Sequence, residues 1–597
     1  MSSRKKQSQR NDAIAALPPI YRAALTSTDK SILNAPVSAT AERVRKGALL
    51  PRDVLLAFGK RTLWAHAQTN CLTEVAIAPG GDLPALSCSS HRDSCAEGLP
   101  LAGIPVSVKD TVSIAGYDST IGYSKYAFKP AAHDAPLIRL LRDAGAIVPF
   151  VKTNVPTTLL AFESTNDVFG RTANPHNHAY SPGGSSGGEA ALLALRGSRI
   201  GVGSDVAGSV RVPAAWSGIY ALRCSTGRFP RSGGMAAMGG QEGVPAVYSP
   251  MATTLADLRY LFESVLDMKP WEYDHTVHPL PLRHPGPGFG DEPVAAAAAA
   301  AAVVRLRWGV LRSDGVVPPT PAIQRALDTT ITALRAYGDE VVELADPPSC
   351  YAALRLAIRL LNADAGETYA SHFTSFFEST DPGVAVLSRF FALPRLAKRL
   401  YAWYLRLRGD PVTAGLVDDL CTRSVADQWR LVAEREAVRA QWFDYLRGPL
   451  GGGNGNGNGN GNGNGNGPVD LILTPVHALP GLPAGGGKDT IAACGYTLLW
   501  NLLDYAAGVV PVGRVDPACD GVEIATADAD GRRGNRRGGN MIARKAWALY
   551  DAGKMAGLPI AVQVVSGRLQ EEAVLAGMER VVEALAKKGV DYHVLGL

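Results

Sequence analysis

The stretch Gly183-Gly184-Ser185-Ser186-Gly187-Gly188 is followed closely by a second one, Gly203-Ser204-Asp205-Val206-Ala207-Gly208-Ser209, and each carries a serine beside glycines. Glycine lets backbone amides approach a reacting oxygen, and it adopts dihedral angles that other residues avoid. Ahead of both stretches, the apolar segment 103–108 leads into Lys109, which can act as a base if burial removes its charge. Two serines, glycine loops and a lysine in this order indicate a hydrolytic site.

The sequence around these motifs predicts alternating helices and strands. Two helices are predicted over 38–47 and 51–66, and Pro51 suits the first turn of the second. From residue 103 the pattern predicts a strand, a helix over 136–144, a strand over 146–151 and another over 200–204. This rhythm is typical of an α/β fold in which helices cover both faces of a large, mixed but mostly parallel, twisted sheet. The loop at Ala207 then follows the end of a strand, where such sheets place their chemistry.

Composition places the chain among ordinary globular proteins. Its 597 residues are 46% hydrophobic and 19% charged, and the formal net charge is +5. The basic runs at 4–6 and 532–537 have no interleaved aromatic residues, so we interpret them as solvated tails and loops and expect no nucleic-acid partner. No apolar segment of a secretory signal follows residues 1–10, and no run of 18 apolar residues occurs. We therefore expect a cytoplasmic protein.

The cysteines give no sign of a metal site. The eight of them form no CxxC pair and no cluster with histidine at the spacing of zinc ligands. We expect neither a metal nor another cofactor.

The chain reads as a polar amino-terminal tail over 1–36 and a single domain over 37–597. Three segments of biased composition interrupt that domain, near 279–302, 451–467 and 528–540. The second contains consecutive Asn-Gly pairs and cannot bury enough apolar surface to order itself. We interpret all three as surface insertions.

Residues 387–408 alternate aromatic and leucine residues with arginines. A basic amphipathic helix of this kind can lie on a membrane surface. A core-facing helix with an arginine-rich wet side gives the same pattern, and Pro394 interrupts it. Peripheral membrane contact therefore stays open, and so does a homodimer.

The chain resembles the amidase signature hydrolases from about residue 99 to 250, from 471 to 516 and from 557 onward. Within that family it is most similar to the fungal acetamidase and general amidase branch, through Met238-Gly239-Gly240-Gln241-Glu242-Gly243-Val244-Pro245 and Leu499-Trp500-Asn501-Leu502-Leu503-Asp504-Tyr505. Fatty acid amide hydrolase is a more distant relative. The resemblance implies the amidase signature fold and hydrolysis of a small-molecule amide to a carboxylate and ammonia or an amine.

The resemblance also implies a role for each motif residue. Ser209 is the nucleophile that forms an acyl-enzyme, Ser185 is the bridging serine beside a non-proline cis peptide, and Lys109 is the base. The backbone amides of Val206, Ala207, Gly208 and Ser209 form the oxyanion hole, although the family usually has glycine at the position of Ala207. Asp205 and Arg211 flank the nucleophile, and we predict that they pair and brace its loop.

Three other interpretations remain open at this point. The run 183–187 matches the G-x-S-x-G elbow of α/β-hydrolases, for which His593 would supply the histidine, but a loop rather than a strand precedes it. A transamidase-type subunit that releases ammonia for a partner protein belongs to the same family. A scaffold that has lost catalysis is supported only by Ala207. The acyl group cannot be read from the sequence, because pocket walls come from scattered residues, which we expect mainly within 345–445.

Overall fold

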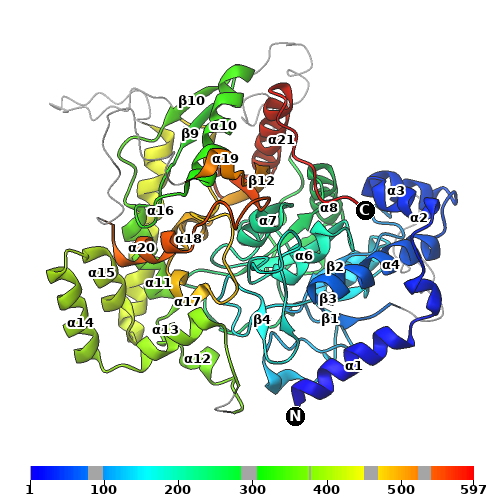
Figure 1. The fold of residues 1–597 in the computed structure, drawn as a ribbon, viewed down its shortest axis with the longest axis horizontal. Coiled ribbons are helices and arrows are strands. Elements are labelled where there is room, and N and C mark those ends of the chain that lie inside the picture. Colours follow the sequence, from blue (N-terminus) through cyan, green and yellow to red (C-terminus); the bar gives the residue numbers. More distant parts are fainter. Residues whose placement is uncertain (1, 78–98, 284–304, 376–377, 449–467, 522–538) are drawn as a thin grey trace.

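An eleven-stranded sheet runs through the centre of the molecule (Figure 1). The computed structural model describes residues 2–77, 99–283, 305–375, 378–448, 468–521 and 539–597. The strand order is β1-β3-β2-β6-β8-β7-β12-β13-β11-β9-β10. The strands are β1 (Leu72–Val75), β2 (Ser107–Lys109), β3 (Val151–Thr153), β6 (Ile200–Asp205), β7 (Tyr220–Arg223), β8 (Val247–Ala252), β9 (Arg307–Val310), β10 (Glu340–Glu343), β11 (Leu471–Pro475), β12 (Ala506–Arg514) and β13 (Pro559–Ser566). Strands β4 (Thr165–Asn166) and β5 (Gly170–Arg171) form a separate antiparallel pair.

The sheet is mixed, as predicted, but it is not mostly parallel. Four of its ten neighbouring pairs within the described strands are parallel and six are antiparallel. The strand–helix–strand rhythm that suggested parallel strands holds for β2, β3 and β6, which do lie parallel. Strand β8 then inserts antiparallel between β6 and β7, and β12 and β13 continue the antiparallel pattern. No local sequence pattern indicated this insertion.

Helices surround the sheet (Figure 1). Helices α10 and α21 pack against each other and against β13, whereas α6 lies against β2, β3 and β6, and α7 lies against β7, β12 and β13. The main helices are α1 (Ser2–Ala16), α2 (Ser27–Asn34), α3 (Val37–Arg45), α4 (Pro51–Thr69), α5 (Pro136–Asp143), α6 (Gly187–Ala194), α7 (Arg211–Ser217), α8 (Leu255–Asp267), α10 (Pro321–Tyr337) and α21 (Glu571–Lys587). The helices predicted at 38–47, 51–66 and 136–144 correspond to α3, α4 and α5, and the strand predicted at 146–151 begins only at Val151.

A group of helices from the middle of the chain stands beside the sheet, at the lower left of Figure 1. Its members are α11 (Cys350–Leu361), α12 (Glu367–Ala370), α13 (Pro382–Ala392), α14 (Arg395–Leu407), α15 (Pro411–Asp419) and α16 (Val425–Arg447). Three short helices from the last part of the chain complete this side, namely α17 (Gly487–Thr490), α18 (Gly495–Leu503) and α20 (Met541–Ala548). Pro394 lies between α13 and α14, so the single amphipathic helix expected over 387–408 is two helices.

The amino-terminal segment differs from a polar tail. Helix α1 inserts Lys6, which is 2% exposed, between the carboxylates of Glu74 and Asp118. Arg10 of the same helix donates to the carbonyl of Leu72 at 2.8 Å. These partners lie about sixty or more residues away in sequence. The local sequence therefore could not show that Lys6 is buried, and the run at 4–6 was predicted to be solvated.

The three expected insertions fall largely where the structure gives no description. Residues 284–302, 451–467 and 528–538 lie outside the described residues, as does the basic run at 532–537.

Candidate active site

Lys109 is the last residue of β2 and is fully buried. Its Nζ donates to Ser185 Oγ at 2.7 Å, to Ser204 Oγ at 2.9 Å and to the Ser204 carbonyl at 3.3 Å. Burial lowers the pKa of Lys109 from its ordinary 10.5 to about 7, and the nearby carboxylates of Asp205 and Glu189 oppose that shift only in part. The amine is therefore poised to lose its proton near neutral pH.

The two serines approach each other from neighbouring segments. Ser185 lies in the loop before α6, next to a cis Gly184–Ser185 peptide, and Ser209 lies in the loop between β6 and α7. The Ser186 amide donates to the Ser209 carbonyl at 3.1 Å and ties the loops together. Among the described residues no direct hydrogen bond joins the two hydroxyls, as is common before substrate tightens a catalytic geometry.

The loop from Val206 to Ser209, the predicted nucleophile loop, presents backbone amides next to Ser209. Among the described residues, the amides of Val206, Ala207 and Ser209 have no hydrogen-bond acceptor, whereas the Gly208 amide donates to Asp205 Oδ1 at 2.8 Å. Gly208 has a φ of 112°, and a Cβ there would come within 2.4 Å of Thr497. Ala207 does not have a positive φ, so alanine causes no backbone strain at this position. The interpretation as a scaffold without catalysis rested on such strain and therefore loses its support.

Asp205 and Arg211 pair across this loop, as predicted. Both are fully buried, with Arg211 Nη2 at 3.1 Å from Asp205 Oδ1 and Nε at 3.1 Å from Oδ2. Asn501 Nδ2 donates to Asp205 at 2.8 Å, and Arg211 Nη1 donates to Gln563 Oε1 at 3.2 Å. Although burial opposes it, the Arg211 guanidinium holds the pKa of Asp205 well below its usual range. The pair fixes the nucleophile loop to α18 and β13.

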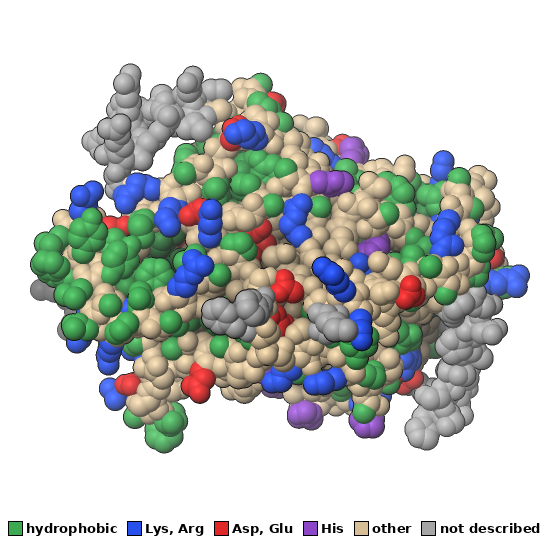
Figure 2. Space-filling model, turned by 60° about the horizontal axis from the view of Figure 1, so that its bottom comes forward, with side chains coloured by type: hydrophobic (Ala, Val, Ile, Leu, Met, Phe, Trp, Pro, Cys, Tyr) green, Lys and Arg blue, Asp and Glu red, His purple; other side chains and the backbone are tan. Residues whose placement is uncertain are grey.

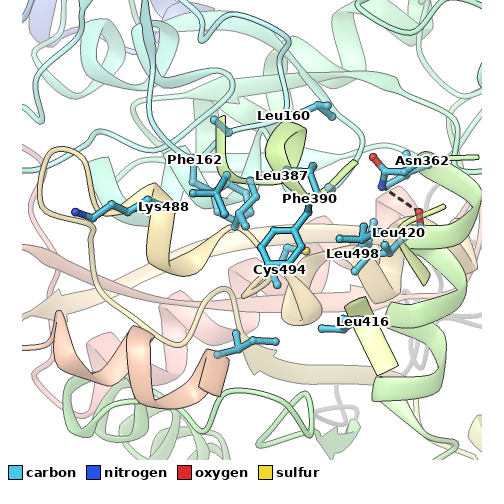
Figure 3. Close-up of a pocket in the computed structure, with 18 of the residues that line it drawn as sticks. Leu160, Phe162, Asn362, Leu387, Phe390, Leu416, Leu420, Lys488, Cys494 and Leu498 are labelled. Carbon is cyan, nitrogen blue, oxygen red and sulfur yellow. Dashed lines mark hydrogen bonds between the residues drawn. The ribbon is translucent and has the colours of Figure 1, made fainter. Parts of the chain in front are cut away.

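An apolar cavity of about 200 Å³ opens at Ser209. Figure 3 shows Phe162, Leu387 and Phe390 gathered at its centre, with Leu416, Leu420 and Leu498 beyond them and Lys488 extending away. These residues come from the loop before β4, from α13, from α15 and the residue that follows it, from α17 and from α18. Many lie within 345–445, as expected, but the segments 159–162, 488–498 and 541–545 also contribute and no sequence signal identified them.

Two further polar residues that the sequence analysis did not single out, Ser204 and Glu189, lie near Lys109. Ser204 accepts from Lys109, as described above, and Glu189 of α6 lies fully buried nearby. Ser204 lies inside the second motif and Glu189 directly follows the first, but their placement near the lysine depends on the sheet.

The elbow mechanism finds no support in this geometry. A loop rather than a strand precedes Ser185. The side chain of His593 is exposed near the end of the chain, and the His593 carbonyl accepts a hydrogen bond from Arg514. Within the described residues, no group of three or more His, Cys, Asp or Glu side chains is arranged to hold a metal ion.

Comparison with known proteins agrees with the resemblance. The family model described as Amidase matches residues 53–575. The chain is 31% identical over 563 residues to an acetamidase of Aspergillus oryzae, covering 93% of this chain and 91% of that protein. It is 32% identical over 564 residues to fatty-acid amide hydrolase 1 of Sus scrofa, covering 93% and 86%.

A solved structure of fatty acid amide hydrolase superposes with a TM-score of 0.76 at 26% identity, covering 98% of this chain and 94% of that one. The chain therefore belongs to the Amidase family and is a hydrolase of carbon–nitrogen bonds other than peptide bonds.

Proposed function

We propose that this protein cleaves carboxylic acid amides through an acyl-enzyme on Ser209, with Ser185 and Lys109 as a proton relay. The observation that carries the proposal is the 2.7 Å contact between a fully buried lysine amine and Ser185. The charged amine donates to Ser185, but in the neutral amine the two N–H groups can donate to the Ser204 hydroxyl and carbonyl while the lone pair accepts from the Ser185 hydroxyl.

The reaction follows from these positions. The neutral amine of Lys109 takes the proton of Ser185, Ser185 takes that of Ser209, and Ser209 Oγ forms a bond to the amide carbon. The oxyanion is stabilised by the free amides of the nucleophile loop. The carbon–nitrogen bond then breaks as the relay returns its proton to the leaving nitrogen, and water releases the carboxylate by the same relay.

The cavity favours an apolar acyl group larger than acetyl. A methyl group would leave most of the 200 Å³ unfilled, whereas each added methylene buried against its walls contributes about 0.8 kcal/mol. The name of the Aspergillus oryzae acetamidase suggests acetamide as the substrate. The size of this cavity instead favours amides with a longer apolar acyl chain.

A second proposal concerns peripheral membrane contact. Four large apolar side chains of α14 are 59–69% exposed, namely Leu396, Leu400, Trp403 and Leu407. Four exposed arginines lie in or directly after the same helix, namely Arg395, Arg399, Arg406 and Arg408. Figure 2 shows hydrophobic side chains gathered at the left edge of the molecule, on the side where this helix lies. This face could rest on an anionic bilayer or on a second copy of the chain. No helix of the described residues has the length and apolar character needed to cross a membrane.

A series of linear primary amides from acetamide upward tests the substrate proposal. We expect kcat/KM to rise by about fourfold per methylene until the cavity is filled, as the burial free energy implies. A fall from acetamide onward would contradict an apolar acyl site, while leaving amide hydrolysis itself intact.

A further inference from the structure

Glu189 is a buried carboxyl group that the proposed mechanism does not use. It lies in the first turn of α6, three residues after Ser186, and is fully buried. Ser107 Oγ donates to its Oε1, and Thr153 Oγ1 donates to its Oε2 at 2.7 Å. None of the ion pairs of the described residues includes this carboxyl. A buried carboxylate without a paired cation is costly, which calls for an explanation.

The surroundings accept either protonation state of Glu189. Ser107 Oγ has a second acceptor in the Ile200 carbonyl at 3.4 Å, and Thr153 Oγ1 has one in the Val108 carbonyl at 3.4 Å. When the carboxyl is ionised, both hydroxyls donate to it. When it is protonated, one hydroxyl can turn to its carbonyl and accept from the acid, so no polar group is left without a partner.

The fold places this carboxyl beneath the catalytic lysine. Ser107 and Lys109 lie two residues apart on β2 and so face the same side of the sheet, and Thr153 is the partner of Lys109 on β3. On β6, Gly201 lies opposite Ser107, and a Cβ there would come within 1.8 Å of Glu189 Oε1. The sheet thus leaves a space for the carboxyl that only glycine provides.

The charged neighbours of Glu189 leave Lys109 as its main electrostatic partner. Cys71, before β1, also interacts with it, but burial raises the pKa of that thiol to about 12 and keeps it neutral. Asp205 of β6 is matched by Arg211 of α7. On α4, Arg61 donates to the Leu195 carbonyl, and Lys60 pairs with Asp29 of α2.

Burial shifts the pKa values of Glu189 and Lys109 toward each other. Burial raises the pKa of Glu189 to about 7, and burial lowers the pKa of Lys109 to about 7. An ionised Glu189 favours the charged amine, whereas a protonated Glu189 favours the neutral amine that the relay needs.

We propose that Glu189 is a positioning residue that sets the pH range over which Lys109 is neutral and able to start the relay. This inference rests on the proposed function of Lys109 as the base. The hydrogen bonds of the Glu189 carboxyl are to Ser107 and Thr153 rather than to Ser209, so it acts through the charge that it presents to the lysine.

The test is the pH profile of kcat/KM for the full-length Glu189→Gln variant. Glutamine keeps the size and acceptor of the side chain but cannot ionise. Without the carboxylate the neutral lysine is favoured, so the acid limb should move to lower pH by about 0.5 units or more. A limb at the wild-type position, with activity merely reduced at every pH, would overturn the inference and leave a packing role.

Thr153→Val gives a second reading should Glu189→Gln fail to fold. It removes a hydroxyl that stabilises the ionised carboxyl, so the acid limb should again move to lower pH, by a smaller amount. The matched control is Thr62→Val on α4, a buried hydroxyl that donates to the Gly197 carbonyl and does not contact Glu189, and its limb should not move. An unshifted limb in Thr153→Val would count against the inference.

Lys109→Ala separates this inference from the proposed function. If that variant keeps wild-type activity and its pH profile, the lysine is not the base and the proposed function fails. If that variant is inactive and Glu189→Gln is unshifted, only the role of Glu189 fails.

Discussion

A lysine can accept a proton at neutral pH only if it is uncharged, and burial favours the uncharged form of Lys109 by lowering its pKa to about 7. Lys109 ends β2, the third strand from one edge of the sheet, and its three hydrogen bonds are to serine oxygens rather than to a carboxylate. A carboxylate in direct contact would restore the charge. The site thus combines desolvation with neutral acceptors to keep a base available.

The pH profile of hydrolysis should report this lysine. Because its pKa is lowered to about 7, the neutral form gains population as pH rises, so kcat/KM should increase through about pH 7 and then level off. Lys109→Ala should reduce kcat/KM by about 10²–10⁴-fold and remove that limb. Steady-state kinetics between pH 5 and 9 measure both, and a wild-type profile flat from pH 5 would contradict the neutral-lysine relay.

The buried Asp205–Arg211 pair should matter for stability as well as for the loop. Arg211→Ala leaves a buried carboxylate unpaired, and the free energy of unfolding should fall by about 3–5 kcal/mol. Because the pKa of Asp205 is depressed in the fold, its stabilisation is present at neutral pH and is lost as pH falls through that depressed value.

Urea unfolding at pH 7 measures the effect of Arg211→Ala. Lys46→Ala is the control, since it breaks an exposed ion pair with Glu42 and should leave the unfolding midpoint unchanged. Equal midpoints for Arg211→Ala and Lys46→Ala would exclude a bracing role for the buried pair.

At the scale of elements, helices from the middle of the chain form much of the cavity wall. Asp381 caps α13 by accepting from the amide of Gly383 at 2.7 Å, and Asp410 caps α15 by accepting from that of Thr413 at 2.9 Å. These caps fix where each helix begins, and so which side chains face Ser209.

Narrowing the cavity should change the choice of acyl group without removing catalysis. Leu416 of α15 is 6% exposed and lines the cavity, so Leu416→Trp should fill space that a long acyl chain occupies. We expect kcat/KM to fall about tenfold or more for the longest amide tolerated by the wild type and to change little for acetamide. Equal losses for both amides would indicate that the cavity does not hold the acyl group.

The exposed face of α14 should decide any lipid binding. Changing Leu396, Leu400 and Trp403 together to serine removes apolar area that is already exposed, so folding should persist. Co-sedimentation with vesicles containing phosphatidylserine at low salt should then decrease several-fold, while amidase activity on a soluble amide stays unchanged. Failure of the wild type to sediment with vesicles at low salt would rule out membrane contact. If the wild type is a dimer and the triple variant a monomer, the face instead binds a second copy of the chain.

At the scale of the whole molecule, the site joins segments that are far apart in the chain. Arg211 reaches Asn501 and Gln563, and the Thr497 hydroxyl donates to the Ala207 carbonyl at 2.7 Å. The nucleophile loop therefore depends on α18 and β13, which join the sheet only after some 300 further residues.

The sequence predicted which motif residues lie near one another better than it predicted the architecture. Ser185 and Ser209 lie in glycine-framed patterns and Lys109 ends an apolar segment, all recognisable locally, and the structure brings Lys109 within hydrogen-bonding distance of Ser185. The antiparallel insertion of β8, the docking of Lys6 and the apolar cavity all depend on partners that are distant in sequence. Periodicity cannot reveal such partners, because it reports only which side of an element is buried.

The central claim is that Ser209 is the nucleophile and that its reactivity depends on Lys109. Labelling with a fluorophosphonate, followed by peptide mass spectrometry, tests it most directly. The account predicts a single adduct on Ser209 that is absent in Ser209→Ala and forms far more slowly in Lys109→Ala. An adduct on Ser185 instead, or rapid labelling of Ser209 in Lys109→Ala, would contradict it.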